Sequence, residues 1–174
     1  MRGSVGPMDT TYRPSGYSTL TPLMTVSPAI EAITFYENVF GARVTSRMDG
    51  PDGAVWHCEL QLDEGRMQLM DPNPQFNVVG ADPQHDEVTY SLAIYVPDVD
   101  ETVRLAVQHG ATVREDVDDF EVTGDRFGSI RDPFGVRWTV MTRTQERTDA
   151  QIQEGLDAWA ASMGEGGAEG QTGS

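Results

Sequence analysis

The sequence predicts an α+β protein made of two βαβββ modules followed by a further helix. The first observation is an internal repeat, in which a strand, a helix and GARVTS are followed later by a strand, a helix and GATVRE. The second is that both helices begin and end with the same kinds of signal residue. The third is that three extended segments follow each helix, so the same pattern occurs twice along 174 residues.

The first module begins with a strand over 18–26 and a helix over 28–40. Ser27 is placed to cap the helix, with Pro28 at its first position, where a missing N–H costs nothing. Gly41 suits the left-handed residue that ends many helices. The turn-forming tripeptides PDG and DEG then separate three extended segments, at 43–48, 54–62 and 66–70.

The second module begins with a strand over 89–96 and a helix over 99–109. Asp98 and Glu101 have the spacing of a capping box at the start of this helix, and Gly110 ends it. The segment DPFG joins the last two of three further extended segments, at 112–117, 126–131 and 136–142.

These elements predict a single folded domain with less ordered ends. A final helix carries Ile152, Leu156, Trp159 and Met163 on one side, which requires an apolar partner in its own sheet or in a second subunit. The predicted divisions are a disordered segment 1–16, a domain 17–145 with modules 17–72 and 88–145 and a linker 73–87, a helix 146–163 and a disordered Gly-rich tail 164–174.

The charge balance excludes several classes of function. All 12 basic residues are arginine, and 28 acidic residues give a net charge of −16. Schiff-base chemistry and the phosphate-binding loop both need a lysine, and a strongly acidic surface repels nucleic acid and anionic membranes. The single cysteine, Cys58, cannot form an internal disulfide, and we find no run of apolar residues that could span a bilayer. We therefore expect a cytoplasmic protein without nucleic-acid or membrane partners.

Three segments resemble the vicinal oxygen chelate superfamily, which includes glyoxalase I, bleomycin-resistance proteins and extradiol dioxygenases. They are SPAIEAITFYENVFGARV, VWHCELQL and GDRFGSIRDPFGVRWTV, and they are most similar to the PhnB-like branch. The resemblance implies the glyoxalase/bleomycin-resistance-like fold, in which the modules form a cupped mixed sheet around a cavity. It does not identify one activity, because this fold carries metalloenzymes, metal-free enzymes and binding proteins.

Strand alternation assigns side chains to the inside or the outside of this cup. We expect Trp56, Trp138 and a buried, inert Cys58 to pack beneath the helices. Metal-binding relatives place His or Glu ligands on four strands, and this chain has poor ligands at the matching positions, which are Thr21, Gln68, Ser91 and Thr139. We therefore expect no metal and no cofactor, and we assign these four side chains to ligand binding.

His57 and Glu59 are the acid–base candidates inside the cup. Two residues apart on one strand, their side chains lie on the same face, where Glu59 could orient the imidazole. The alternative is a polar pair that only holds neighbouring strands or a subunit interface together.

Arg66, Tyr95 and Arg137 are further candidates for ligand contact inside the cup. The guanidinium group of Arg66 or of Arg137 could form bidentate hydrogen bonds to a substrate carboxylate or phosphonate. The alternative for each arginine is a salt bridge to Glu59 or another acid of the protein.

Three functional hypotheses follow. The first is a metal-free binding protein, a homodimer that holds a small metabolite or antibiotic in the cup. The second is a metal-independent isomerase, cyclase or lyase with His57 as its general acid or base. The third is a scaffold or regulatory protein with a filled cup.

Overall fold

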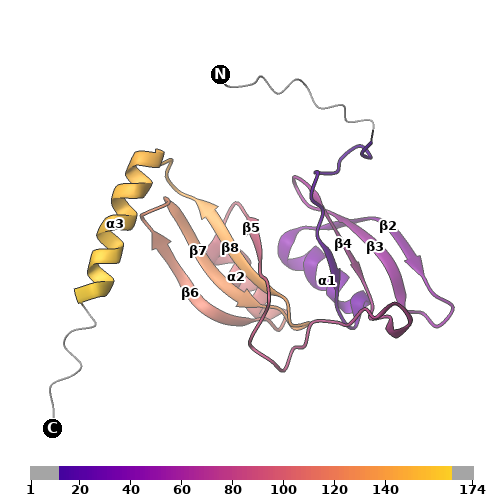
Figure 1. The fold of residues 1–174 in the computed structure, drawn as a ribbon. Coiled ribbons are helices and arrows are strands. Elements are labelled where there is room, and N and C mark those ends of the chain that lie inside the picture. The colour runs from indigo at the N-terminus through magenta and orange to yellow at the C-terminus, as the bar shows by residue number, and fades with distance from the viewer. Residues whose placement is uncertain (1–11, 166–174) are drawn as a thin grey trace, which may run out of the picture. The chain divides into compact units, whose positions relative to one another are not determined.

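The computed structural model describes residues 12–165, which fall into two compact units that divide between Gln84 and His85. Each unit contains a four-stranded mixed sheet with one helix packed on it, and the second unit also carries a C-terminal helix (Figure 1). The predicted α+β class and the repeated βαβββ pattern are confirmed. Most of the predicted disordered ends, 1–11 and 166–174, lies outside the described residues.

The first unit has the sheet order β1-β4-β3-β2, in which β1 is parallel to β4 and the other pairs are antiparallel. Its elements are β1 (Leu23–Thr25), α1 (Ala29–Phe40), β2 (Arg43–Asp49), β3 (Val55–Gln61), β4 (Arg66–Met70) and the short 3₁₀ helix η1 (Pro74–Phe76). One sheet face buries its side chains in a shared core with α1, formed by Met24, Ile33, Tyr36, Leu60 and Leu69. We call the opposite face of each sheet its open face.

The start of α1 differs from the prediction. Ser27 does not cap the helix; Pro28 is the N-cap residue, and it has no side chain that could accept the first N–H groups. Asp71, at the end of β4, accepts instead from the backbone N–H of Ala29 at 2.9 Å and of Val55 at 2.8 Å. One carboxylate thereby joins the ends of a helix and two strands. Gly41 ends the helix in the left-handed conformation, as predicted.

The second unit repeats this arrangement with the order β5-β8-β7-β6, in which β5 is parallel to β8. Its elements are β5 (Leu92–Tyr95), α2 (Val99–Gln108), β6 (Thr112–Phe120), β7 (Asp125–Arg131), β8 (Arg137–Arg143) and α3 (Asp149–Glu165). Asp98 caps α2 by accepting from the Glu101 N–H at 3.0 Å, as the capping-box spacing predicts. The Glu101 carboxylate pairs with Arg104 instead of returning to the cap.

The hairpin between β7 and β8 is organised by Asp132, which is 3% exposed. Its Oδ1 accepts from the backbone N–H groups of Phe134 at 3.0 Å and Val136 at 2.9 Å, and its Oδ2 accepts from the Trp138 indole N–H at 3.0 Å. Trp138 is buried, as predicted. The DPFG segment therefore has a structural role.

Helix α3 finds part of its apolar partner within its own unit. The Trp159 ring meets Phe120 edge to face with centroids 6.4 Å apart, and Gly155 lies so close to Val122 that a Cβ would be 3.3 Å from its Cα. Leu156 and Trp159 nevertheless remain 38% and 48% exposed. The Met163 side chain lies outside the described residues.

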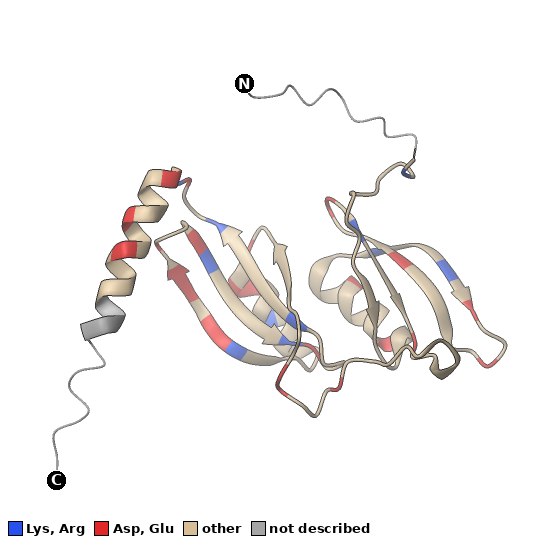
Figure 2. Ribbon diagram, in the orientation of Figure 1, with Lys and Arg blue, Asp and Glu red and all other residues tan. Residues whose placement is uncertain are grey.

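Strands β2 and β6 are the sheet edges opposite the parallel pairs, and nearly all their residues are exposed. Acidic side chains are concentrated along β6 and α3 in the second unit (Figure 2). Those of β6 are Glu115, Asp116, Asp118 and Asp119.

Candidate functional site

The open face of the first sheet carries a cluster of polar side chains. The pairs Glu59↔Gln68 and Gln61↔Arg66 across β3 and β4 place these residues side by side, half-buried, on the face opposite α1. His57 lies on the same face, and its Nε2 is 3.4 Å from Glu59 Oε1. The structure therefore brings together four residues of the predicted site, which are His57, Glu59, Arg66 and Gln68.

Glu59 is the centre of this cluster. Hydrogen bonding from the Tyr17 hydroxyl, then from His57, with the charges of His57 and Arg66, lowers the pKa of Glu59 despite partial burial. The carboxylate is therefore held ionised. It can orient His57, and its other two partners are Tyr17 and Arg66.

Arg66 is held by neighbours from three directions. Its Nη1 lies 3.5 Å from Glu59 Oε2, its Nε donates to Gln61 Oε1 at 2.9 Å, and its guanidinium lies 4.6 Å from the centre of the Tyr17 ring. Gly16, with φ of +83°, lies so close to the same guanidinium that a Cβ at this position would be 3.1 Å from Arg66 Nη2. The structure thus favours the salt-bridge alternative for Arg66.

Trp56 corrects the predicted core. In the pairing with β2, Asp49 faces Val55 and Met48 faces His57, so Trp56 is the extra residue of a β-bulge. The bulge shifts the alternation by one residue. Val55 is buried in its place, and Trp56 is 55% exposed. Cys58 keeps its predicted buried position, where desolvation raises its pKa to about 11.

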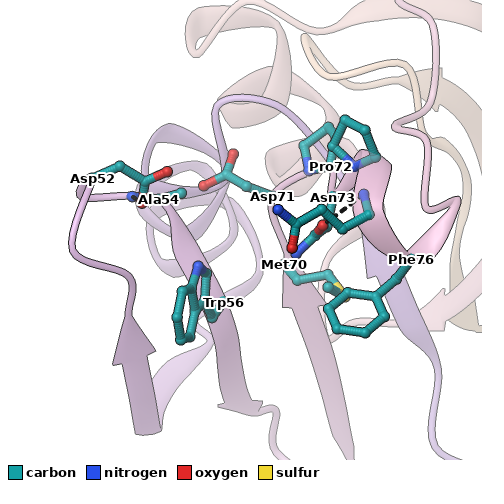
Figure 3. Close-up of a pocket in the computed structure, with 10 residues that line it drawn as sticks. Asp52, Ala54, Trp56, Met70, Asp71, Pro72, Asn73 and Phe76 are labelled. Atoms are coloured by element: carbon teal, nitrogen blue, oxygen red, sulfur yellow. Dashed lines mark hydrogen bonds between the residues drawn. The ribbon is translucent and has the colours of Figure 1, made fainter.

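The displaced indole borders a hollow of about 760 Å³ in the first unit, which we call the aromatic hollow. Figure 3 shows Trp56 on one side, with Met70 and Phe76 across from it. Met70 belongs to the row of Arg66 and Gln68 on β4, so the hollow continues the open face toward the β4–η1 connection. Alternation alone could not find Trp56 or Phe76 as lining residues, because the bulge and the 3₁₀ turn break the period.

In the second unit, the candidates Arg137 and Tyr95 both have polar partners within the protein. Arg137 Nε donates to Ser129 Oγ at 3.2 Å, and its Nη2 lies 3.9 Å from Glu115 Oε2. Tyr95 is 56% exposed, and its hydroxyl lies 3.4 Å from both Asp125 and Arg143.

Strand register changes two of the four positions matched to metal ligands. Leu23, not Thr21, faces Gln68 across β1 and β4, and Ala93, not Ser91, faces Thr139 across β5 and β8. Thr21 precedes β1 because parallel pairing begins only at Pro22, whose carbonyl accepts from the Gln68 N–H.

The divalent metal used by enzymes of the superfamily does not fit these side chains. Leu23 lies beside Gln68 and Ala93 lies beside Thr139, whereas such metals prefer imidazole, carboxylate or thiolate ligands. Among residues 12–165, no three His, Cys, Asp or Glu side chains gather as a metal site would require.

No helix within residues 12–165 has the length and apolar character needed to cross a membrane.

The repeated βαβββ units and their open faces define a member of the vicinal oxygen chelate fold. The chain belongs to the Glyoxalase/Bleomycin resistance protein/Dioxygenase superfamily, whose sequence model matches residues 21–140. It is 33% identical over 147 residues to the uncharacterized protein Rv0887c of Mycobacterium tuberculosis, a match covering 80% of this chain and 82% of that one.

Several solved structures share the fold. TioX from Micromonospora sp. ML1 is 21% identical with a TM-score of 0.56, covering 72% of this chain and 98% of TioX. A PhnB protein from Bacillus cereus, described as a putative 3-demethylubiquinone-9 3-methyltransferase, is 19% identical with a TM-score of 0.55, covering 72% and 99%. At these identities the likeness is one of fold.

Proposed function

We propose that this protein is a metal-free small-molecule-binding protein that holds a small metabolite or antibiotic against the open face of its sheets. The observation that carries the proposal is that Arg66 and Arg137, the two candidate arginines for an anionic substrate, lie in salt-bridge contact with Glu59 at 3.5 Å and with Glu115 at 3.9 Å. The aromatic hollow of the first unit is open, which argues against a filled scaffold.

The same proposal includes a homodimer in the cytoplasm, without nucleic-acid or membrane partners. The net charge of −16 supports the absence of nucleic-acid and membrane partners, since it repels polyanions, and it favours neutral or cationic guests.

The test combines metal analysis with a thermal-shift screen of neutral, cationic and anionic small molecules. We expect purified protein without stoichiometric transition metal, and stabilisation by neutral or cationic compounds. A ligand at 100 times its Kd adds about 2.7 kcal/mol to the free energy of unfolding. One bound transition metal per chain that is required for ligand binding would contradict the proposal.

A second candidate function is a metal-independent isomerase, cyclase or lyase in which His57 is the general acid or base. It is favoured by the 3.4 Å contact from His57 Nε2 to Glu59, because an oriented imidazole beside an ionised carboxylate can accept and return a proton. A His57→Ala variant distinguishes the two. Loss of turnover with unchanged ligand affinity supports the enzyme, and unchanged behaviour in both assays excludes His57 from the site.

A further inference from the structure

The aromatic hollow combines two exposed aromatic rings with a flexible thioether. Phe76 is 72% exposed, Trp56 is 55% exposed, and Met70 lies half-buried between the two elements that carry them. Large aromatic surfaces left open to water beside a concavity are characteristic of sites that bury a ligand. The volume of about 760 Å³ is in the range of small-molecule sites.

The position of the Trp56 indole is built into the chain. The β-bulge turns it out of the core, and Gly50 lets it rest directly against the backbone of the β2–β3 turn. A Cβ on Gly50 would overlap the indole nitrogen and lie 2.6 Å from its Cε2 atom. The turn is closed by hydrogen bonds from the Gly50 N–H to the Ala54 carbonyl at 2.8 Å and from the Gly53 N–H to the Gly50 carbonyl at 3.0 Å.

The charged residues that line the hollow are acidic. Asp52 lies at the turn beside the indole, where its Oδ1 accepts from the Ala54 N–H at 3.2 Å. Asp71 is fixed on the other side by the backbone N–H groups of Ala29 and Val55. The remaining lining residues are neutral: Ala54, Trp56, Met70, Pro72, Asn73, Pro74, Gln75 and Phe76. A cation is therefore attracted both by the carboxylates and by the face of the indole.

We infer that the aromatic hollow binds a planar aromatic organic cation, with its ring against Trp56 and its positive group toward Asp52. This inference rests on the proposed binding function and adds the ligand class and the residues that select it. Met70 and Phe76 cover the opposite side of the ring, since a thioether adapts its shape to an aromatic partner. The polar cluster around Glu59 is not needed for this contact.

The test compares two probes of similar shape and opposite charge, the cation proflavine and the anion anthracene-9-carboxylate. Binding is measured by isothermal titration calorimetry at 0.15 M salt, which weakens long-range attraction between exposed charges. We expect proflavine to bind the wild-type protein and anthracene-9-carboxylate to bind at least about tenfold more weakly. Absence of proflavine binding at millimolar concentration, or equal affinity for both probes, overturns the inference.

Matched variants locate the site. Trp56→Ala should weaken proflavine about tenfold or more, whereas Trp159→Ala, which removes another half-exposed indole at the same net charge, should leave it unchanged. Gly50→Ala should also weaken it, because it displaces the indole while keeping every lining side chain. Asp52→Asn should reduce proflavine affinity severalfold without changing the affinity for neutral acridone.

The outcomes separate this inference from the proposed function. If another small molecule stabilises the protein but its affinity is unchanged in Trp56→Ala, the binding function holds and the inference fails. If proflavine binds equally to wild type and Trp56→Ala, the dye binds elsewhere and the inference also fails. Circular dichroism of each variant confirms that it is folded.

Discussion

Replacing Asp132 should destabilise the second unit more than almost any other single polar substitution. In Asp132→Ala, the N–H groups of Phe134 and Val136 and the indole N–H of Trp138 all lose their acceptor. Both backbone groups belong to buried residues, so water does not readily replace the carboxylate. A buried donor left unpaired costs about 1–3 kcal/mol, and partial relaxation brings the expected total to about 3–5 kcal/mol.

Asp132→Asn provides the graded control. Its amide keeps one neutral oxygen for the two backbone donors but turns an NH₂ group toward the indole, so we expect a loss of about 2–3 kcal/mol. The assay is urea unfolding followed by Trp138 fluorescence in a background with Trp56 and Trp159 changed to phenylalanine. A loss below about 1 kcal/mol in Asp132→Ala would refute the assignment of this carboxylate as the organiser of the hairpin.

Three further predictions follow from the geometry. Tyr17→Phe removes the hydroxyl that contributes most to the lowered pKa of Glu59, so this pKa should rise in a carboxyl NMR titration, and an unchanged pKa would be inconsistent with the Tyr17 contact. Ionised Glu59 stabilises the fold above its unfolded pKa, and this stabilisation is lost as pH falls through the folded pKa. The acid unfolding of the variant should therefore begin at a higher pH than that of the wild type. Cys58, whose pKa is raised to about 11, should react with a thiol reagent at pH 8 at least about a hundredfold more slowly in native than in unfolded protein. Gly124→Ala should lower the free energy of unfolding, measured with urea, by about 2–4 kcal/mol, because φ is +77° and a Cβ would overlap the Gln145 carbonyl. The control Gly41→Ala, at φ of +64° with open space around it, should lower this free energy by about 1–2 kcal/mol. Equal decreases in the two variants would show that the overlap at Gly124 is relieved.

Repetition and strand alternation were sufficient to predict the fold class and most of the sheet faces. Met67 and Leu69 face α1 while Gln68 and Met70 face away from it, because an uninterrupted strand keeps a period of two. Alternation failed at Trp56, since a single extra residue inverts the faces on one side of a bulge. Nothing local in VWHCELQL marks that insertion, which depends on the pairing with β2.

The candidate site was predictable in its β3 and β4 residues and not in those that approach from elsewhere. His57 and Glu59 share one face of β3, and antiparallel pairing with β4 brings Arg66 beside them. Tyr17 reaches Glu59 from a segment that precedes β1, a contact that no strand period encodes. The same limit explains the cap of α1, which Asp71 supplies from 42 residues away.

The exposed edge strand β6 has a consequence for how this protein behaves in concentrated solution. An exposed edge strand has backbone N–H and C=O groups that can pair with a strand of another molecule and so form an intermolecular sheet. Four carboxylates within its nine residues oppose this by repelling another copy of the same edge. The surplus of acidic residues thus serves, at this strand, to keep the protein dispersed.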